Sequence, residues 1–253
     1  MAATRAGTSS TPPWEPGSSS GPSSRRPLGL HRGFTIEDPD SAVVDRDYAA
    51  RWGYRTIDAR RYESRRYAGW TRRLNFRLLA RRIRQALRDV PQGAAVLDAP
   101  CGTGVLNDVF ASLGFRVTSL DISPAMLDVA AERGGSRGCV RADLERLPFH
   151  SGAFDAVVCN RFLMHVPSEG RPAVMRELCR VSRGPLVVTV CHPYTLKTFG
   201  RSVRRALGLR AKHHERIGMD QIRREATAAG LSLVRVTSVT PLLSEVWVVE
   251  LRG

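Results

Sequence analysis

Residues 94–104 read AAVLDAPCGTG. An apolar run that ends in Asp98 and continues into a proline and two glycines predicts a buried strand followed by a sharp turn. Apolar residues at helical spacing follow over 106–113. Glycines let the backbone approach a ligand closely, and the start of a helix presents unpaired N–H groups. The stretch therefore predicts a nucleotide-sized site at the edge of an α/β sheet, with a tight turn that binds nothing as the alternative.

The same alternation of strand and helix continues to the end of the chain. Several of the strands are nearly continuous apolar runs, which is typical of parallel strands buried on both faces. Only a short link through Pro241 separates the last two strands, so we expect them to be antiparallel neighbours. The predicted fold class is α/β: a Rossmann-like sheet of seven strands, mostly parallel with an antiparallel last strand, and helices on both faces. The strands are expected at 95–99, 116–121, 136–142, 153–160, 184–191, 232–240 and 246–251, and the helices at 106–113, 124–133, 171–181 and 219–229, with an irregular piece near Leu147.

Two segments of different composition precede this sheet domain, which spans 93–253. Residues 1–33 are rich in Ser, Pro and Gly and have too little apolar surface to offset the entropy of ordering, so we expect a disordered tail. Residues 34–92 read as an N-terminal, arginine-rich helical cap, whose last helix is expected at 74–90. A basic, lid-like insertion is expected within the sheet domain at about 193–218.

The formal net charge of +15 is unevenly distributed. Residues 93–192 hold 10 Arg and 10 acids, whereas residues 46–88 hold 14 Arg and 3 acids. Two explanations of this arginine surplus are open. The arginines could lie on solvated helix faces, or they could bind an anionic substrate or a nucleic acid. The five cysteines lack paired spacing, no apolar run reaches the length of a membrane span, and we expect no secretory signal. We therefore expect a cytoplasmic protein with reduced thiols and no metal site.

Carboxylates follow three successive strands of the expected sheet, at Asp98, Asp121 and Asp143. Ligands of open α/β sheets bind outside the carboxyl ends of the strands, and an acid roughly 20 residues after the glycines commonly accepts from ribose hydroxyls. Asp143 could accept from an exocyclic amine. Asn107 stands where a dinucleotide fingerprint needs its third glycine, and Asp98 would repel a pyrophosphate. A ligand with an ammonium or sulfonium cation fits better, although any one acid could also be a helix cap or a turn residue.

Four motifs follow one another along the chain: VLDAPCGTG at 96–104, LDISPAML at 120–127, ADLERLPF at 142–149 and FDAVVCN at 154–160. In these motifs the chain resembles the class I S-adenosylmethionine-dependent methyltransferase family. One departure is Ala99, where the family often has glycine. The resemblance implies that residues 93–253 form a methyltransferase domain and that its cofactor is S-adenosyl-L-methionine.

The resemblance also implies which residues bind this cofactor. The glycine turn would hold its methionine end, the acid after the second strand its ribose, and the residues after the second and third strands its adenine. The implied set is Asp98, Ala99, Pro100, Cys101, Gly102, Gly104, Asp121, Ile122, Met126, Asp143, Leu144 and Asn160, and Arg66 is a further candidate for the cofactor carboxylate.

The implied reaction is an in-line displacement at the methyl group of a sulfonium. A general base is needed only if the acceptor must lose a proton. The candidates are His165 and His192, with a packed structural histidine as the alternative for each. The leading hypothesis is methyl transfer to a small or lipid-like acceptor, and the basic segments suit an anionic one. The alternatives are an RNA methyltransferase that grips phosphates with its arginines, and a catalytically silent scaffold.

Overall fold

A computed structural model describes residues 58–61, 69–195, 216–240 and 243–253. These ranges include the whole predicted sheet and the last helix of the predicted cap. The tail predicted for 1–33, the rest of the cap, the candidate Arg66 and most of the expected insertion lie outside the described residues.

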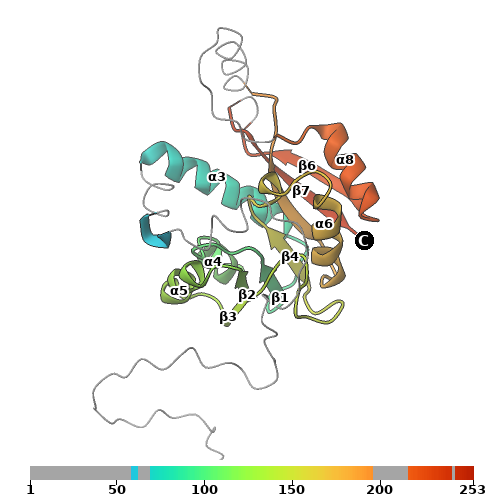
Figure 1. Cartoon of the computed structure of the whole chain (residues 1–253). Helices are drawn as coiled ribbons and strands as arrows, with labels where there is room; N and C mark the ends of the chain where they lie inside the picture. The colour runs from blue at the N-terminus through green and yellow to red at the C-terminus, as the bar shows by residue number, and fades with distance from the viewer. Residues whose placement is uncertain (1–57, 62–68, 196–215, 241–242) are drawn as a thin grey trace, which may run out of the picture. The chain divides into compact units, whose positions relative to one another are not determined.

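Seven strands form one mixed sheet (Figure 1). β7 is antiparallel to both of its neighbours, β5 and β6, and every other neighbouring pair is parallel. The predicted fold class, including the antiparallel last strand, is therefore confirmed. β4 begins at Ala156, later than expected, because Phe154 pairs only through an isolated bridge to Ser182. The strands are β1 (Ala95–Asp98), β2 (Arg116–Asp121), β3 (Gly138–Arg141), β4 (Ala156–Cys159), β5 (Leu186–Cys191), β6 (Ser232–Ser238) and β7 (Val246–Arg252), in the order β3-β2-β1-β4-β5-β7-β6.

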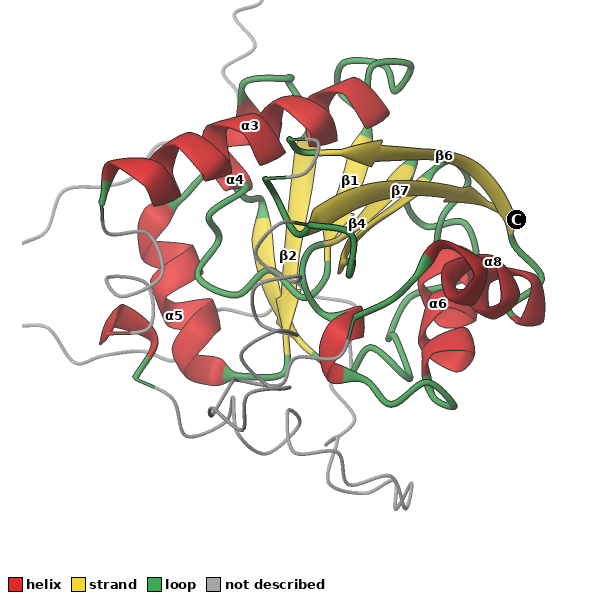
Figure 2. Cartoon of the chain, turned by 90° about the horizontal axis from the view of Figure 1, so that it is seen from above, coloured by secondary structure: helices red, strands yellow, loops and turns green. Residues whose placement is uncertain are grey.

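Helices cover both faces of the sheet (Figure 2). Successive residues of a strand point to opposite faces. Val96 and Val158 accordingly pack in the core beneath α3 and α4, whereas Leu97, Val157 and Val188 pack in the core beneath α6 and α8. No helix of the described ranges is both long enough and apolar enough to cross a bilayer. The helices are α3 (Trp70–Ala86), α4 (Asn107–Ala111), α5 (Pro124–Arg133), α6 (Arg171–Arg180) and α8 (Met219–Ala228), with the short 3₁₀ helix η2 (Leu163–His165).

Helix α3 begins and ends one turn earlier than the predicted 74–90. The Val90 N–H donates to the carbonyl of Leu87 at 3.0 Å and so closes a turn instead of continuing the helix. The α conformation is disfavoured for a residue that precedes proline, and Pro91 follows directly. The apolar spacing therefore identified the helix correctly but placed both of its ends one turn too late.

A buried ion pair joins α6, α8 and the segment after β4. Arg171 is fully buried, and its Nη1 donates to Glu225 Oε1 at 2.8 Å. Its Nε donates to the carbonyls of Leu163 and Val166, at 2.9 Å each. Buried pairs recover little net free energy, because both charges lose their hydration, but they fix an arrangement. Here the pair holds η2 against α8.

Candidate active site

The turn between β1 and α4 brings two glycines to the carboxyl edge of the sheet. Gly102 has φ 54° and Gly104 has φ 67°, a region that strains residues with side chains. A Cβ added at Gly104 would lie 3.0 Å from Ala130 Cβ and 2.8 Å from Asn107 Nδ2, whereas a Cβ added at Gly102 would meet nothing within 4 Å. Gly104 is thus required for packing against α5, and Gly102 leaves room for a ligand.

Asp98 ends β1 with a carboxylate that no described residue satisfies. It is 1% exposed, and neither carboxylate oxygen has a hydrogen-bond partner within the described ranges. Burial raises the pKa of the Asp98 carboxyl well above its usual range, and the charge of Asp121 raises it further. A buried carboxylate without a hydrogen-bond partner costs free energy of folding, and a ligand that donates hydrogen bonds to it offsets this cost. The complementary group is a cation that can donate hydrogen bonds, such as an ammonium.

Asp121 ends the neighbouring strand, β2, and holds the glycine turn. Its Oδ2 accepts from the Gly102 N–H at 2.9 Å, and its Oδ1 accepts from the Ser123 N–H at 3.0 Å. Burial raises the pKa of Asp121 to about 6, against the lowering effect of these bonds. Each carboxylate oxygen has a second acceptor position. Asp121 can therefore fix the turn and still accept from ligand hydroxyls.

The third acid, Asp143, follows β3, which pairs with β2. Asp121 on β2 pairs with Arg141 on β3, which is the last pair between these two strands. Asp143 lies two residues beyond it. The carboxylate is buried, and its Oδ1 accepts from the Glu145 N–H at 3.0 Å. Asp98, Asp121 and Asp143 therefore follow three adjacent strands at one edge of the sheet. The side chains of the predicted adenine neighbours Met126 and Leu144 are buried, and that of Ile122 is half-buried.

The turn residues between Asp98 and Gly102 are held mainly by the sheet itself. The Ala99 N–H donates to the Val158 carbonyl at 3.0 Å, and the Cys101 N–H donates to the Leu120 carbonyl at 2.8 Å. Burial raises the pKa of the Cys101 thiol well above its usual range, so the thiol is neutral. These two N–H groups are thus used within the sheet, and the role of Ala99 and Cys101 in cofactor binding stays a prediction.

A hydrogen-bonded group that sequence reasoning missed lies at the end of β4. The Thr189 hydroxyl, on β5, donates to Asn160 Oδ1 at 2.8 Å and accepts from the Arg161 N–H at 2.7 Å. Arg161 has φ 59°, an unusual value for a residue with a side chain, and this N–H bond holds it there. The sequence signal was a single hydroxyl within the apolar run LVVTVC. The arrangement orients the Asn160 amide at the predicted mouth of the site.

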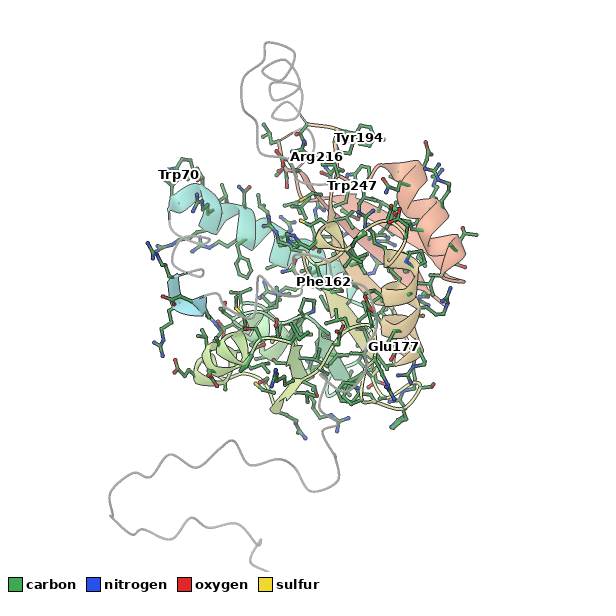
Figure 3. The ribbon with its side chains drawn as sticks, in the orientation of Figure 1. Trp70, Phe162, Glu177, Tyr194, Arg216 and Trp247 are labelled. Atoms are coloured by element: carbon green, nitrogen blue, oxygen red, sulfur yellow. The ribbon has the colours of Figure 1, made fainter. Side chains whose placement is uncertain are left out.

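The two candidate bases differ in their surroundings. His192 is 2% exposed and stacks on Trp247 with 4.3 Å between ring centroids, and its Nδ1 accepts from the Tyr194 N–H at 3.2 Å. Burial lowers the pKa of His192. Figure 3 shows Tyr194 and Trp247 together beside the start of β7. The indole of Trp247, on β7, thus packs over the His192 ring, and the role of His192 as a base stays a prediction. His165, half-buried on η2, stays a candidate base.

We searched the described ranges for side chains that could bind a metal ion together. No group of three His, Cys, Asp or Glu side chains there could hold an ion. The site consists instead of a glycine turn, three carboxylates after adjacent strands and an oriented amide. This combination suits an organic ligand with a cation and hydroxyl groups.

Comparison with known proteins identifies the family. A family model described as a methyltransferase domain matches residues 97–185. A ubiquinone biosynthesis O-methyltransferase of Xanthomonas oryzae pv. oryzae (strain PXO99A) is 31% identical over 169 residues, which are 61% of this chain and 68% of that enzyme. The chain therefore belongs to the class I S-adenosylmethionine-dependent methyltransferase family. It is a methyltransferase with S-adenosylmethionine as its cofactor.

Two further proteins show how the similarity is distributed. A malonyl-[acyl-carrier protein] O-methyltransferase of Serratia marcescens is 38% identical over 91 residues, so the match spans only 36% of this chain and 35% of that enzyme. The magnesium protoporphyrin IX methyltransferase of Synechocystis PCC 6803, solved with bound SAH, has a TM-score of 0.65 at 20% identity. It covers 81% of this chain and 98% of its own, and at this identity it supports the fold alone.

Proposed function

We propose that this methyltransferase transfers the methyl group to an oxygen atom of a small or lipid-like acceptor, with an anionic acceptor favoured. The observation that carries the cofactor part is the buried Asp98 carboxylate, which has no partner among the described residues, beside the open side of Gly102. Support for an oxygen acceptor comes from the two sequence relatives, which are both named O-methyltransferases. The arginines of residues 46–66, which precede α3 in the sequence, support an anionic acceptor.

The residues present fit S-adenosylmethionine. Asp98 would accept from its ammonium group, and Gly102 would allow the methionine part to approach the turn. Asp121 would accept from the ribose hydroxyls with its remaining lone pairs, and Asp143 would accept from the adenine amine. Asn160, oriented by Thr189, would line the mouth of the site.

The bound cofactor supplies a methyl group already activated on a sulfonium. The protein's part is therefore to hold an acceptor oxygen in line with that methyl group and to exclude water. A carboxylate acceptor is already ionised and needs no base, whereas a hydroxyl acceptor must lose its proton. His165 is our candidate for taking that proton, because η2 places it directly after β4 and Arg171 holds η2 in place.

The proposal is tested by following tritiated methyl groups from S-adenosylmethionine into a cell extract separated into lipid, small-molecule, RNA and protein fractions. We expect label in the lipid or small-molecule fraction. Mild alkali then distinguishes the two oxygen classes, since methyl esters release methanol and methyl ethers do not. Label in RNA would support the RNA methyltransferase alternative. A folded protein that binds no S-adenosylmethionine in calorimetry would support the silent scaffold.

Replacing Thr189 with valine should weaken S-adenosylmethionine binding about tenfold, because the Asn160 amide loses the hydroxyl that orients it. Calorimetric titration of folded protein measures this dissociation constant. The matched control is Thr189→Ser, which keeps the hydroxyl and should bind within about twofold of wild type. Equal weakening by the two substitutions would show that β5 packing, and not the hydroxyl, matters here.

A further inference from the structure

The outward face of α3 has a composition that the methyltransferase reaction does not explain. The helix reads WTRRLNFRLLARRIRQA, with six arginines and no acid. Its buried residues are Leu79, Ala80 and Ile83, which pack on the sheet. At 100° per residue, Trp70, Leu74 and Arg81 lie opposite Leu79 and Ile83, and further arginines extend this side toward Ala80. This outward stripe consists of Trp70, Arg73, Leu74, Arg77, Arg81 and Arg84.

The two large apolar residues of the outward stripe are solvent-exposed. Trp70 is 77% exposed and Leu74 is 46% exposed, and they lie one helical turn apart. Figure 3 shows Trp70 at the N-terminal end of α3, projecting outward from the ribbon. A single exposed apolar residue needs no explanation. An exposed Trp–Leu pair at i and i+4 beside several arginines is less common. The two apolar side chains favour an apolar environment, whereas the arginines favour water or anionic groups.

The charges on the outward stripe are available to a partner. Arg73, Arg77 and Arg81 are exposed, and none forms an ion pair with a residue that the structure describes. Arg84 donates to the Ser112 hydroxyl at 3.1 Å, which leaves its charge uncompensated. With no acid on the helix, the stripe presents a concentrated positive field.

We propose that α3 docks this protein on the surface of an anionic lipid bilayer. The arginines would contact lipid phosphates, and Trp70 and Leu74 would insert at the boundary between headgroups and acyl chains. Tryptophan prefers this interface because its ring is apolar and its N–H is polar. A bilayer uses both parts of the stripe at once, whereas RNA would use the arginines and could stack on Trp70 but offers Leu74 no apolar surface.

Docking through α3 does not involve the predicted catalytic edge. α3 lies across a face of the sheet (Figure 2). Asp98 and Asp121 are the last residues of β1 and β2, and Asp143 follows β3. The proposal therefore does not rest on which acceptor is methylated. It would place the enzyme where lipid-like molecules are concentrated.

The test is flotation of the full chain with vesicles of phosphatidylcholine alone or mixed with phosphatidylglycerol. We expect binding only to the mixed vesicles, with affinity that falls as salt is added. The triple variant Arg73→Gln, Arg77→Gln, Arg81→Gln should lower the partition coefficient about a hundredfold. The double variant Trp70→Ala, Leu74→Ala should lower it about tenfold or more at unchanged charge.

The matched control removes the same charge elsewhere. Arg223→Gln, Arg224→Gln, Arg235→Gln deletes three exposed arginines from α8 and β6, and its vesicle binding should stay within about threefold of wild type. Trp70 fluorescence should shift to the blue on binding, and Trp70→Phe should abolish the shift. Equal losses in the two triple variants, or wild-type binding to an RNA oligonucleotide without binding to vesicles, would overturn the proposal. Calorimetry with S-adenosylmethionine should give wild-type affinity for every variant, which separates this test from that of the reaction.

Discussion

Replacing Asp98 with asparagine should weaken S-adenosylmethionine binding about a hundredfold, because one charge-assisted pair with the ligand ammonium is lost. The effect should depend on pH. The raised pKa keeps Asp98 protonated well above the usual range of a carboxyl in the ligand-free protein. Pairing with an ammonium requires the ionised form, so the carboxyl must release its proton on binding. Wild-type affinity should therefore rise with pH up to the raised pKa and level off above it.

The stability of the ligand-free protein should show the opposite trend. For a carboxyl whose pKa is raised by folding, the stabilising contribution is complete below the unfolded value of about 3.9 and is lost as pH rises through the folded pKa. Asp98→Asn removes this term, so the ligand-free variant should gain stability relative to wild type as pH increases. The substitution should thus stabilise the protein while it impairs binding.

Calorimetry in two buffers of different ionisation enthalpy measures the proton release directly. Asp98→Asn should remove the proton release that comes from Asp98. A smaller proton release should remain, centred near pH 6, because the pKa of Asp121 is raised to about 6. Asp128→Asn, an exposed acid on α5, is the control and should behave as wild type. If the affinity of Asp98→Asn were close to that of wild type at every pH, Asp98 would not be the ammonium site.

The positions of these three acids could be predicted from the order of the strands. Their hydrogen bonding and protonation could not, because both depend on burial in the folded protein. Asp98, Asp121 and Asp143 could be placed at one edge because each stands at the end of a predicted strand, and parallel strands align their carboxyl ends. The different states of the first two could not be foreseen. The Asp121 carboxylate is bonded to two N–H groups, whereas that of Asp98 has no partner among the described residues. These differences arise from contacts between strands that are distant in sequence.

The same limit applies to the surroundings of His192. His192 follows β5, and its position after a strand indicated a place at the site. Its ring packs on Trp247, a residue of β7 that no local pattern connects to it. Thr189 was overlooked for the same reason, since its partner Asn160 directly follows another strand, β4. Local spacing predicted the elements, but pairing across strands determined what each polar side chain does.

The two glycines of the turn should respond differently to substitution by alanine. Gly104→Ala should destabilise the fold by about 3 kcal/mol, because a positive φ is strained for alanine and its Cβ would overlap Ala130 and Asn107. Gly102→Ala should cost only about 1 kcal/mol, since its Cβ would meet no atom within 4 Å. Thermal and urea unfolding of the ligand-free proteins measure both changes.

Cofactor binding should reverse this order for the folded proteins. The space beside Gly102 is where the methionine end should approach the backbone, so a methyl group there should weaken binding roughly a hundredfold through misplacement of the ligand. Gly134→Ala is a control, because Gly134 has φ 74° and open space but lies after α5. It should show the stability cost without the binding defect. A Gly102→Ala protein that binds S-adenosylmethionine as tightly as wild type would mean that the ligand does not lie against this turn, whatever happens at Asp98.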